Sequence, residues 1–440
     1  TLTCRRDFTK CLNLQPAALL TNIVIAAVFT LLLGFAADLL NNSWAILRAP
    51  RPRPEKPGID LDRLKKARGK VNAVINHTGE RAAGALRAAA APGTWQRGTP
   101  AARRVLTAAL FIVLTGLIAL FAAFTDPEFR PGTPRSIAIY LSLFVAVGLV
   151  GLIYARVQTA RARALGHEAG VRMRPLSVLI IIAGAAVSRI IDFLPGLLIA
   201  VPAGYALIKL KPAPADQPPD PQAQPAAHRR IVSAGLLAVL ITGLLAWLLA
   251  VPIDLLIGAL LAQPETTASV VGLNSLGAVA SVLLTIYVVA VLLAFFALTP
   301  LRFTAGHWLM TGARPVWGLA YGLTAFIALH TMINPQQAGL EAFSNPVLLI
   351  LGALAAVFSG AALMAWLSVN DRQMSADAPV NKRTLFSVIV LLGGWFAIGA
   401  CGLLSFVSRN VDLNAVLLIA AVIAVAILGL TVVIRVRAKA

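Results

Sequence analysis

The residues with the clearest potential for chemistry are an arginine and an aspartate within an apolar segment. Arg189 and Asp192 are three positions apart, so their side chains would share one face if this turn is helical. Ionisable side chains at membrane depth are costly and are functional candidates by default. The spacing predicts either a buried ion pair that fixes the local fold or a substrate or proton site.

The segment around this pair, Leu176–Ile208, predicts an interrupted helical hairpin. It is too long for one ordinary membrane span and too short for two comfortable ones. Pro195, Gly196 and Pro202 would break its second helix, as in the discontinuous helices of transporters. We therefore expect two short helices, which either cross as two thin spans or form a re-entrant loop that enters and leaves on the same side.

Few other residues predict chemistry. Cys4 and Cys11 could pair in an oxidising compartment, although the sequence does not decide whether this disulfide forms. Asp38 and Asp254 lie near predicted span ends, where interface or helix-capping roles are expected. His330 lies near the outer end of its span and predicts a hydrogen-bonded packing residue rather than a proton relay. Nucleotide-binding, zinc-protease and serine-hydrolase motifs are absent from the sequence, so we expect no metal, no cofactor and no enzymatic activity.

The composition predicts the elements that position these residues. Of 440 residues, 58% are hydrophobic and 13% are charged, yet the formal net charge is +20. This apolar fraction exceeds the roughly 45–50% of soluble domains and excludes a disordered basic tail. The basic segments lack interleaved aromatic residues, so we expect no nucleic-acid partner. Because only helices satisfy their own backbone within lipid, we predict an all-α polytopic membrane helix bundle.

A span needs about 20 mostly apolar residues. On this criterion the chain has nine full spans in addition to the short or re-entrant hairpin at 176–208. The nine spans are Ala17–Leu40, Val105–Phe124, Ile137–Ala155, Ile231–Val251, Val270–Thr299, Val316–Ile333, Pro346–Val369, Leu385–Val407 and Leu413–Ile434.

The loop charges predict the orientation. The loop 42–104 holds 14 basic and 4 acidic residues, so it is expected on the cytoplasmic side. Alternation from there gives 31 basic residues inside and 6 outside, with Arg189 alone left within the membrane. The N-terminus is then outside and the C-terminus inside the plasma membrane.

These assignments divide the chain into an exocytoplasmic stretch (1–16), a first span (17–41), a basic loop (42–104), two spans with the hairpin (105–211), a Pro-rich linker (212–230) and a six-span half (231–440). Within the loop, 59–91 predicts a basic amphipathic helix. It either lies on anionic inner-leaflet lipids or packs on the inner ends of the spans. The sequence opens as if an exported segment had been removed or a further N-terminal domain preceded it.

Two stretches carry a family resemblance. The first span of actinobacterial FGLLP motif-containing membrane proteins resembles Leu14–Leu20 together with Leu31–Asn42. The Ser-Arg-Leu…Pro-Gly-Tyr-Leu hairpin of the same proteins resembles Ser188–Leu198. Leu197 replaces the tyrosine, and Asp38 stands where glutamate is usual. The resemblance covers about a tenth of the chain. It implies a polytopic envelope protein with an exported N-terminal region, and it implies no reaction.

Three functions fit these observations. The first is a non-enzymatic membrane anchor or assembly partner that links the exported N-terminal region to the cytoplasmic side. The second is a secondary transporter or channel with its site at 176–208. The third and weakest is an enzyme acting on lipid-linked substrates, because acidic or histidine clusters are lacking. Expected partners are anionic inner-leaflet lipids, other proteins or a second copy of the chain.

Overall fold

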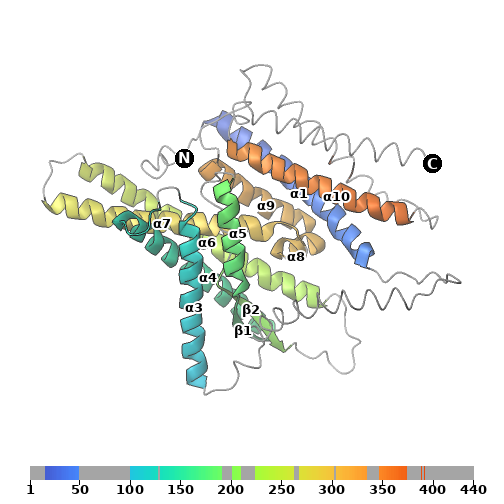
Figure 1. Cartoon of the computed structure of the whole chain (residues 1–440), viewed down its shortest axis with the longest axis horizontal. Helices are drawn as coiled ribbons and strands as arrows, with labels where there is room; N and C mark the ends of the chain where they lie inside the picture. Colours follow the sequence, from blue (N-terminus) through green and yellow to red (C-terminus); the bar gives the residue numbers. More distant parts are fainter. Residues whose placement is uncertain are drawn as a thin grey trace, which may run out of the picture. The chain divides into compact units, whose positions relative to one another are not determined.

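The computed structural model describes residues 15–48, 100–126, 129–190, 201–209, 223–261, 267–301, 304–333 and 346–373, together with 388 and 391. The described residues are mostly helical and include one two-stranded sheet (Figure 1). The chain divides into two compact units, Arg48–Val113 and the remainder. The elements discussed below belong to the larger unit from Leu114 onward, together with helix α1.

Five helices are long and apolar enough to cross a membrane: α1 (Pro16–Arg48), α3 (Pro100–Ala123), α4 (Pro134–Ala164), α6 (Ala223–Leu261) and α7 (Thr267–Leu298). They coincide with five of the nine predicted spans. Many large apolar side chains on them stay exposed, including Leu237 and Leu245 of α6. Water would oppose such exposure, whereas lipid solvates it. The multi-pass membrane class is therefore confirmed.

Three shorter elements follow α7. Helix α8 (Ala305–Gly312) connects it to α9 (Arg314–Ala328), which continues into a π-helical turn, η4 (Leu329–Ile333). Helix α10 (Pro346–Gln373) comes next. Helix α9 with η4 and helix α10 cover the sixth and seventh predicted spans. The last two predicted spans fall outside the described residues apart from 388 and 391, and the amphipathic helix predicted at 59–91 falls entirely outside them.

Helix α4 ends in a tight reversal. Gly166 has a φ of 81°. Its N–H donates to the Arg163 carbonyl, and the N–H of His167 donates to the Ala162 carbonyl. This is the Schellman arrangement, in which a glycine takes the left-handed conformation that closes a helix. The turn directs the chain into strand β1.

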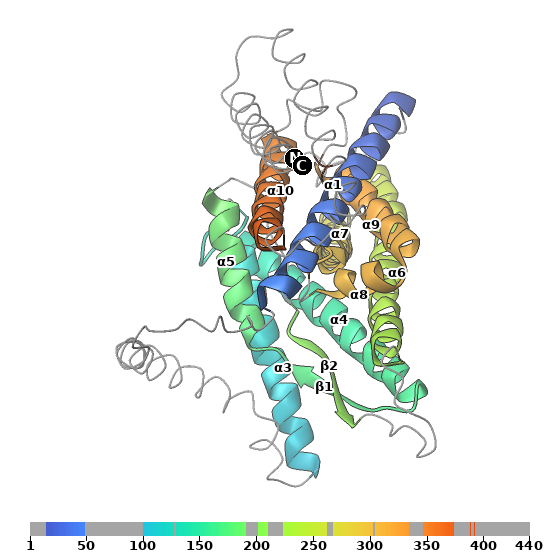
Figure 2. The same cartoon turned by 90° about the vertical axis from the view of Figure 1, so that its right-hand side faces the viewer.

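Strands β1 (Glu168–Met173) and β2 (Ala203–Lys209) form an antiparallel ribbon in which Val171 opposes Tyr205. The expectation of a purely helical fold is therefore wrong here, and so is the second hairpin helix at 203–208. The ribbon lies beside the end of α4 (Figures 1 and 2). A strand depends on its pairing partner, and the partner of β2 lies about 35 positions earlier in the chain.

The interrupted segment returns to its own starting point. Helix α5 (Leu176–Ile190) leaves from β1, and the chain is described again from Val201. The Arg174 N–H donates to the Pro202 carbonyl at 2.9 Å, and Ser177 Oγ donates to the Val201 carbonyl at 2.6 Å. The chain thus re-emerges where it left, which agrees with a segment that enters and leaves on one side.

Helix α6 is longer than the sequence predicted. It begins at Ala223, within the predicted linker 212–230, and passes through Pro252 to Leu261. The predicted end of the linker is therefore wrong, because residues 223–230 are already helical. Asp254 lies within the helix instead of capping it. Proline is tolerated inside membrane helices because neighbouring groups can satisfy the freed carbonyl.

The helices of the larger unit meet at a shared end, which we call the ribbon end. It consists of β1 and β2 with the ends of α1, α4 and α7, the start of α6, and α8. Asn41 of α1 contacts Pro300 after α7, and Tyr205 of β2 contacts His228 of α6. The core lies between α4, α6, α7 and α9. At Gly243 a Cβ would come within 2.7 Å of Ala290, so α6 and α7 approach closely.

Candidate functional site

Arg189 lies exposed near the end of α5 and binds backbone carbonyls. Its Nε donates to the Phe124 carbonyl at 2.6 Å and its Nη2 to the Asp126 carbonyl at 3.3 Å. Both acceptors follow the last residue of α3, where helix carbonyls lack intrahelical partners and carry partial negative charge. These contacts give Arg189 the geometry of a cation that holds α5 to the end of α3.

Most of the other predicted site residues lie outside the described part of the chain. Asp192, Pro195 and Gly196 lie outside the described residues, as do Cys4 and Cys11. The predicted ion pair and disulfide therefore stay predictions. Pro202 is described: it precedes β2 and packs on α4, where a Cβ at Gly151 would come within 2.9 Å of its Cδ.

A second polar contact joins the first part of α1 to η4. Asn22 Nδ2 lies 3.0 Å from His330 Nδ1, and both residues are buried. The imidazole stacks on Phe326, with ring centroids 5.4 Å apart and planes 8° apart. His330 thus makes the hydrogen bond and the packing contact that the sequence led us to expect. With the asparagine amide as donor, Nδ1 accepts and the imidazole carries its proton on Nε2.

Small side chains let α1 approach the bundle along its middle. A Cβ at Gly34 would lie 2.9 Å from two ring carbons of Trp317, so the indole occupies the space that a side chain would need. The same indole donates from Nε1 to the Leu298 carbonyl at 2.8 Å. Phe29 stacks on Phe295 with centroids 6.1 Å apart. Helix α1 therefore packs directly on α7 and α9.

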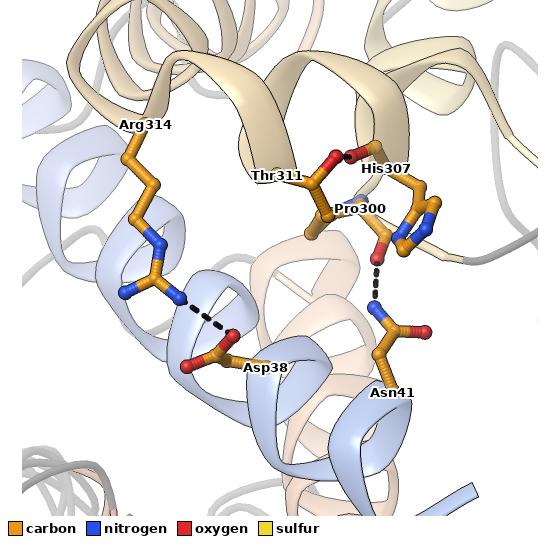
Figure 3. Close-up of polar contacts among 6 residues, drawn as sticks. All are labelled: Asp38, Asn41, Pro300, His307, Thr311 and Arg314. Atoms are coloured by element: carbon orange, nitrogen blue, oxygen red, sulfur yellow. Dashed lines mark hydrogen bonds and ion pairs between the residues drawn. The ribbon is translucent and has the colours of Figure 1, made fainter. Parts of the chain in front are cut away.

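At the ribbon end, α1 makes two further polar contacts (Figure 3). Asp38 Oδ1 accepts from Arg314 Nη2 at 2.7 Å, and Asn41 Nδ2 donates to the Pro300 carbonyl at 3.0 Å. The ion pair is partly solvated, because the side chain of Arg314 is 57% exposed and that of Asp38 is 19% exposed. Asp38 thus joins α1 to α9 instead of capping a helix.

We call these three positions together the α1 site: Asn22 with His330, Gly34 with Trp317, and Asp38 and Asn41 with Arg314 and Pro300. The sequence marked Asp38 and His330 as polar residues in or near spans. It could not supply their partners, which are 276 and 308 positions away in the chain. Asn22 itself gave only a weak signal, a single amide within an apolar run.

A separate polar group lies at the ribbon end. The Tyr205 hydroxyl is hydrogen-bonded to His228 Nδ1, and the His228 ring meets Trp308 edge to face at 4.7 Å. Burial raises the pKa of Tyr205 to about 12, and the neighbouring Arg174 cation opposes the shift. The phenol therefore stays neutral at physiological pH.

Among the described residues, no group of three His, Cys, Asp or Glu side chains could hold a metal ion. The contacts of the α1 site are well formed for holding one helix against others. They contain no nucleophile paired with a base, which acyl or phosphoryl transfer would need. No family model, curated protein or solved structure matches this chain.

Proposed function

We propose that this chain is a non-enzymatic envelope protein that anchors an exported N-terminal region to the cytoplasmic side of the plasma membrane. The proposal includes nine full spans, an outside N-terminus and an inside C-terminus. It also includes kinship with the FGLLP motif-containing proteins, in which an exported region precedes the first span. Anionic inner-leaflet lipids, partner proteins or a second copy would be its partners.

The observation that carries the proposal is the attachment of α1. This helix connects the N-terminal stretch to the basic loop 42–104, so a firm attachment of α1 would hold the two points at which these segments join it. Its contacts at Asn22, Gly34, Asp38 and Asn41 reach α9, η4 and the segment after α7. An anchor needs such a helix to resist displacement, whereas a channel gate needs a helix that moves.

The charge distribution supports the orientation. Among the described side chains of the larger unit, exposed arginines at or near the ribbon end outnumber those at the opposite end. Those of the ribbon end are Arg156, Arg161, Arg163, Arg172, Arg174, Arg230 and Arg314, and those of the opposite end are Arg130, Arg135 and Arg189. Positive charge gathers on the cytoplasmic side of membrane proteins. The ribbon end would therefore face the cytoplasm.

The test compares partner recovery with α1 intact and replaced. The tagged chain is purified from native membranes in mild detergent, and its stably bound proteins are identified. A matched variant carries an unrelated apolar helix of equal length in place of 17–41, with its flanks unchanged. We expect the same partners in repeated wild-type preparations and their loss from the variant. Equal recovery with both chains would contradict the anchor function.

A secondary transporter or channel is the alternative function. The buried imidazole of His330 favours it, because Nε2 has no hydrogen-bond partner within the described part of the chain and π-helical turns often occur at functional sites. The contacts of Arg189 with carbonyls favour a structural role for the hairpin instead. Solute or proton flux into proteoliposomes that is lost in a folded His330→Phe variant would support transport over anchoring.

A further inference from the structure

The ribbon end presents an arginine whose charge has no partner in the described structure. Arg174 lies between β1 and α5 and is exposed. None of the described carboxylates or carbonyls bonds to its guanidinium. Its backbone N–H is held by the Pro202 carbonyl at 2.9 Å, so the residue itself is fixed in place.

The neighbouring strand is shaped to receive this guanidinium. A Cβ at Gly204 would lie 2.5 Å from Arg174 Nε and 2.6 Å from its Nη2. Any larger residue would therefore displace the guanidinium, and only glycine lets it rest on β2. A planar guanidinium offers parallel N–H donors, the geometry that matches phosphate.

Other polar groups and further cations lie beside Arg174. The next residue of β2, Tyr205, keeps its hydroxyl proton and contacts His228. Arg172 on β1 and Arg161 near the end of α4 are also exposed. Glu168 is the single carboxylate on β1, at its far end. The local charge is therefore positive.

An apolar surface begins directly next to this basic group. Leu176 and Leu179, on the first turn of α5, are 60% and 55% exposed. A soluble anion would make no contact with this apolar surface, whereas the acyl chains of a lipid would cover it. Trp308 packs on His228 nearby, and tryptophan is enriched where membrane meets water.

We propose that Arg174, seated on Gly204 and flanked by Tyr205 and His228, binds the phosphate of an anionic phospholipid whose acyl chains lie along Leu176 and Leu179. The site deepens the proposed lipid partnership by naming where it occurs. It rests on the membrane location and is independent of the anchor function. A failed partner-recovery experiment would leave it standing.

The test measures lipid binding to the full-length chain in detergent. Phosphatidylglycerol is titrated against the wild type, Arg174→Gln, Arg174→Lys and Arg156→Gln, with binding followed by native mass spectrometry. Arg156 is the matched control for total charge, because it is another exposed arginine of the ribbon end and lies on α4. We expect about a 10-fold weaker Kd for Arg174→Gln, the loss of one charge-assisted contact, and an intermediate Kd for Arg174→Lys.

Other outcomes would overturn the site. Equal affinity of the wild type and Arg174→Gln for phosphatidylglycerol would show that Arg174 does not bind the lipid. An equal loss in Arg156→Gln would show a general charge effect. Full competition by inorganic phosphate would assign the site to a free anion, and equal binding of phosphatidylcholine would exclude recognition of an anionic lipid. If Arg174→Gln does not fold, the folded Arg174→Lys variant decides, because it keeps the charge and loses the paired donors.

Discussion

Helices α1 and α5 are both apolar, yet the bundle holds them differently. Helix α1 is bound near its start through Asn22, at its middle through Gly34 and at the ribbon end through Asp38 and Asn41. The described hydrogen bonds of α5 to other segments lie at its two ends, through Ser177 and Arg189.

The difference follows from what each helix presents along its sides. Buried alanines of α1, at 26, 36 and 37, allow close approach to the bundle. Helix α5 exposes Leu179, Ile180 and Ile182 between its two attachments and buries Ile181 in the core. We infer that polar contacts hold α1 along its whole length, whereas α5 has such contacts only at its ends and depends between them on the buried Ile181. The variants below test this contrast in detergent, from the largest expected effect to the smallest.

Adding one methyl group at Gly34 should produce the largest effect. Gly34→Ala places its Cβ 2.9 Å from the Trp317 ring, which must shift or push α1 outward. We expect a loss of about 2 kcal/mol in the free energy of unfolding. Gly318→Ala is the control, because a Cβ there meets nothing within 4 Å. Equal stability of the two variants would contradict close packing of α1 on α9.

The buried contact near the start of α1 comes next. Asn22→Leu leaves His330 Nδ1 buried without this partner and should lower stability by about 1–1.5 kcal/mol. The double variant Asn22→Leu/His330→Phe removes both polar groups and should recover part of this loss. Thermal unfolding midpoints of the four chains complete the cycle. A double variant less stable than the sum of the two singles would argue against the pairing.

The attachment of α5 should matter less, because Arg189 is exposed. Arg189→Ala removes two donors to the carbonyls after α3 and should cost about 1 kcal/mol after allowance for solvent screening. Arg130→Ala is the control, since Arg130 is exposed at the same end and its side chain makes no hydrogen bond among the described residues. A folded Arg189→Ala that keeps full stability but loses solute flux would favour a transport site.

The exposed ion pair of α1 should have the smallest effect. Asp38→Asn or Arg314→Gln should lower stability by about 0.5 kcal/mol, because partly solvated pairs contribute little. The exchange Asp38→Arg/Arg314→Asp should restore most of this loss. The effect should nearly vanish in 1 M salt, where the screening length is about 3 Å. An effect that is the same in low and high salt would speak for packing rather than charge.

Part of the candidate site could be predicted from the sequence. His330 is a polar residue within an apolar run, and its packing role follows from the general cost of burying an unpaired imidazole. Arg189 was also visible as the one basic residue outside the loops. Its predicted partner Asp192 lies outside the described residues, and the structure adds contacts of Arg189 with carbonyls about 65 positions earlier. Local spacing suggests neighbours within one helix and contains no information about neighbouring helices.

The sequence alone determined the membrane class and the positions of the apolar helices, because hydropathy over about 20 residues is a local property and lipid leaves the backbone few choices. Only the tertiary structure decided which segments meet. The pairing of β1 with β2, the continuation of α6 through Pro252, and the contacts of Asn22 and Asp38 all depend on groups that are distant in the chain or on packing around them. Such contacts arise from how the helices pack together, which no short window of sequence contains.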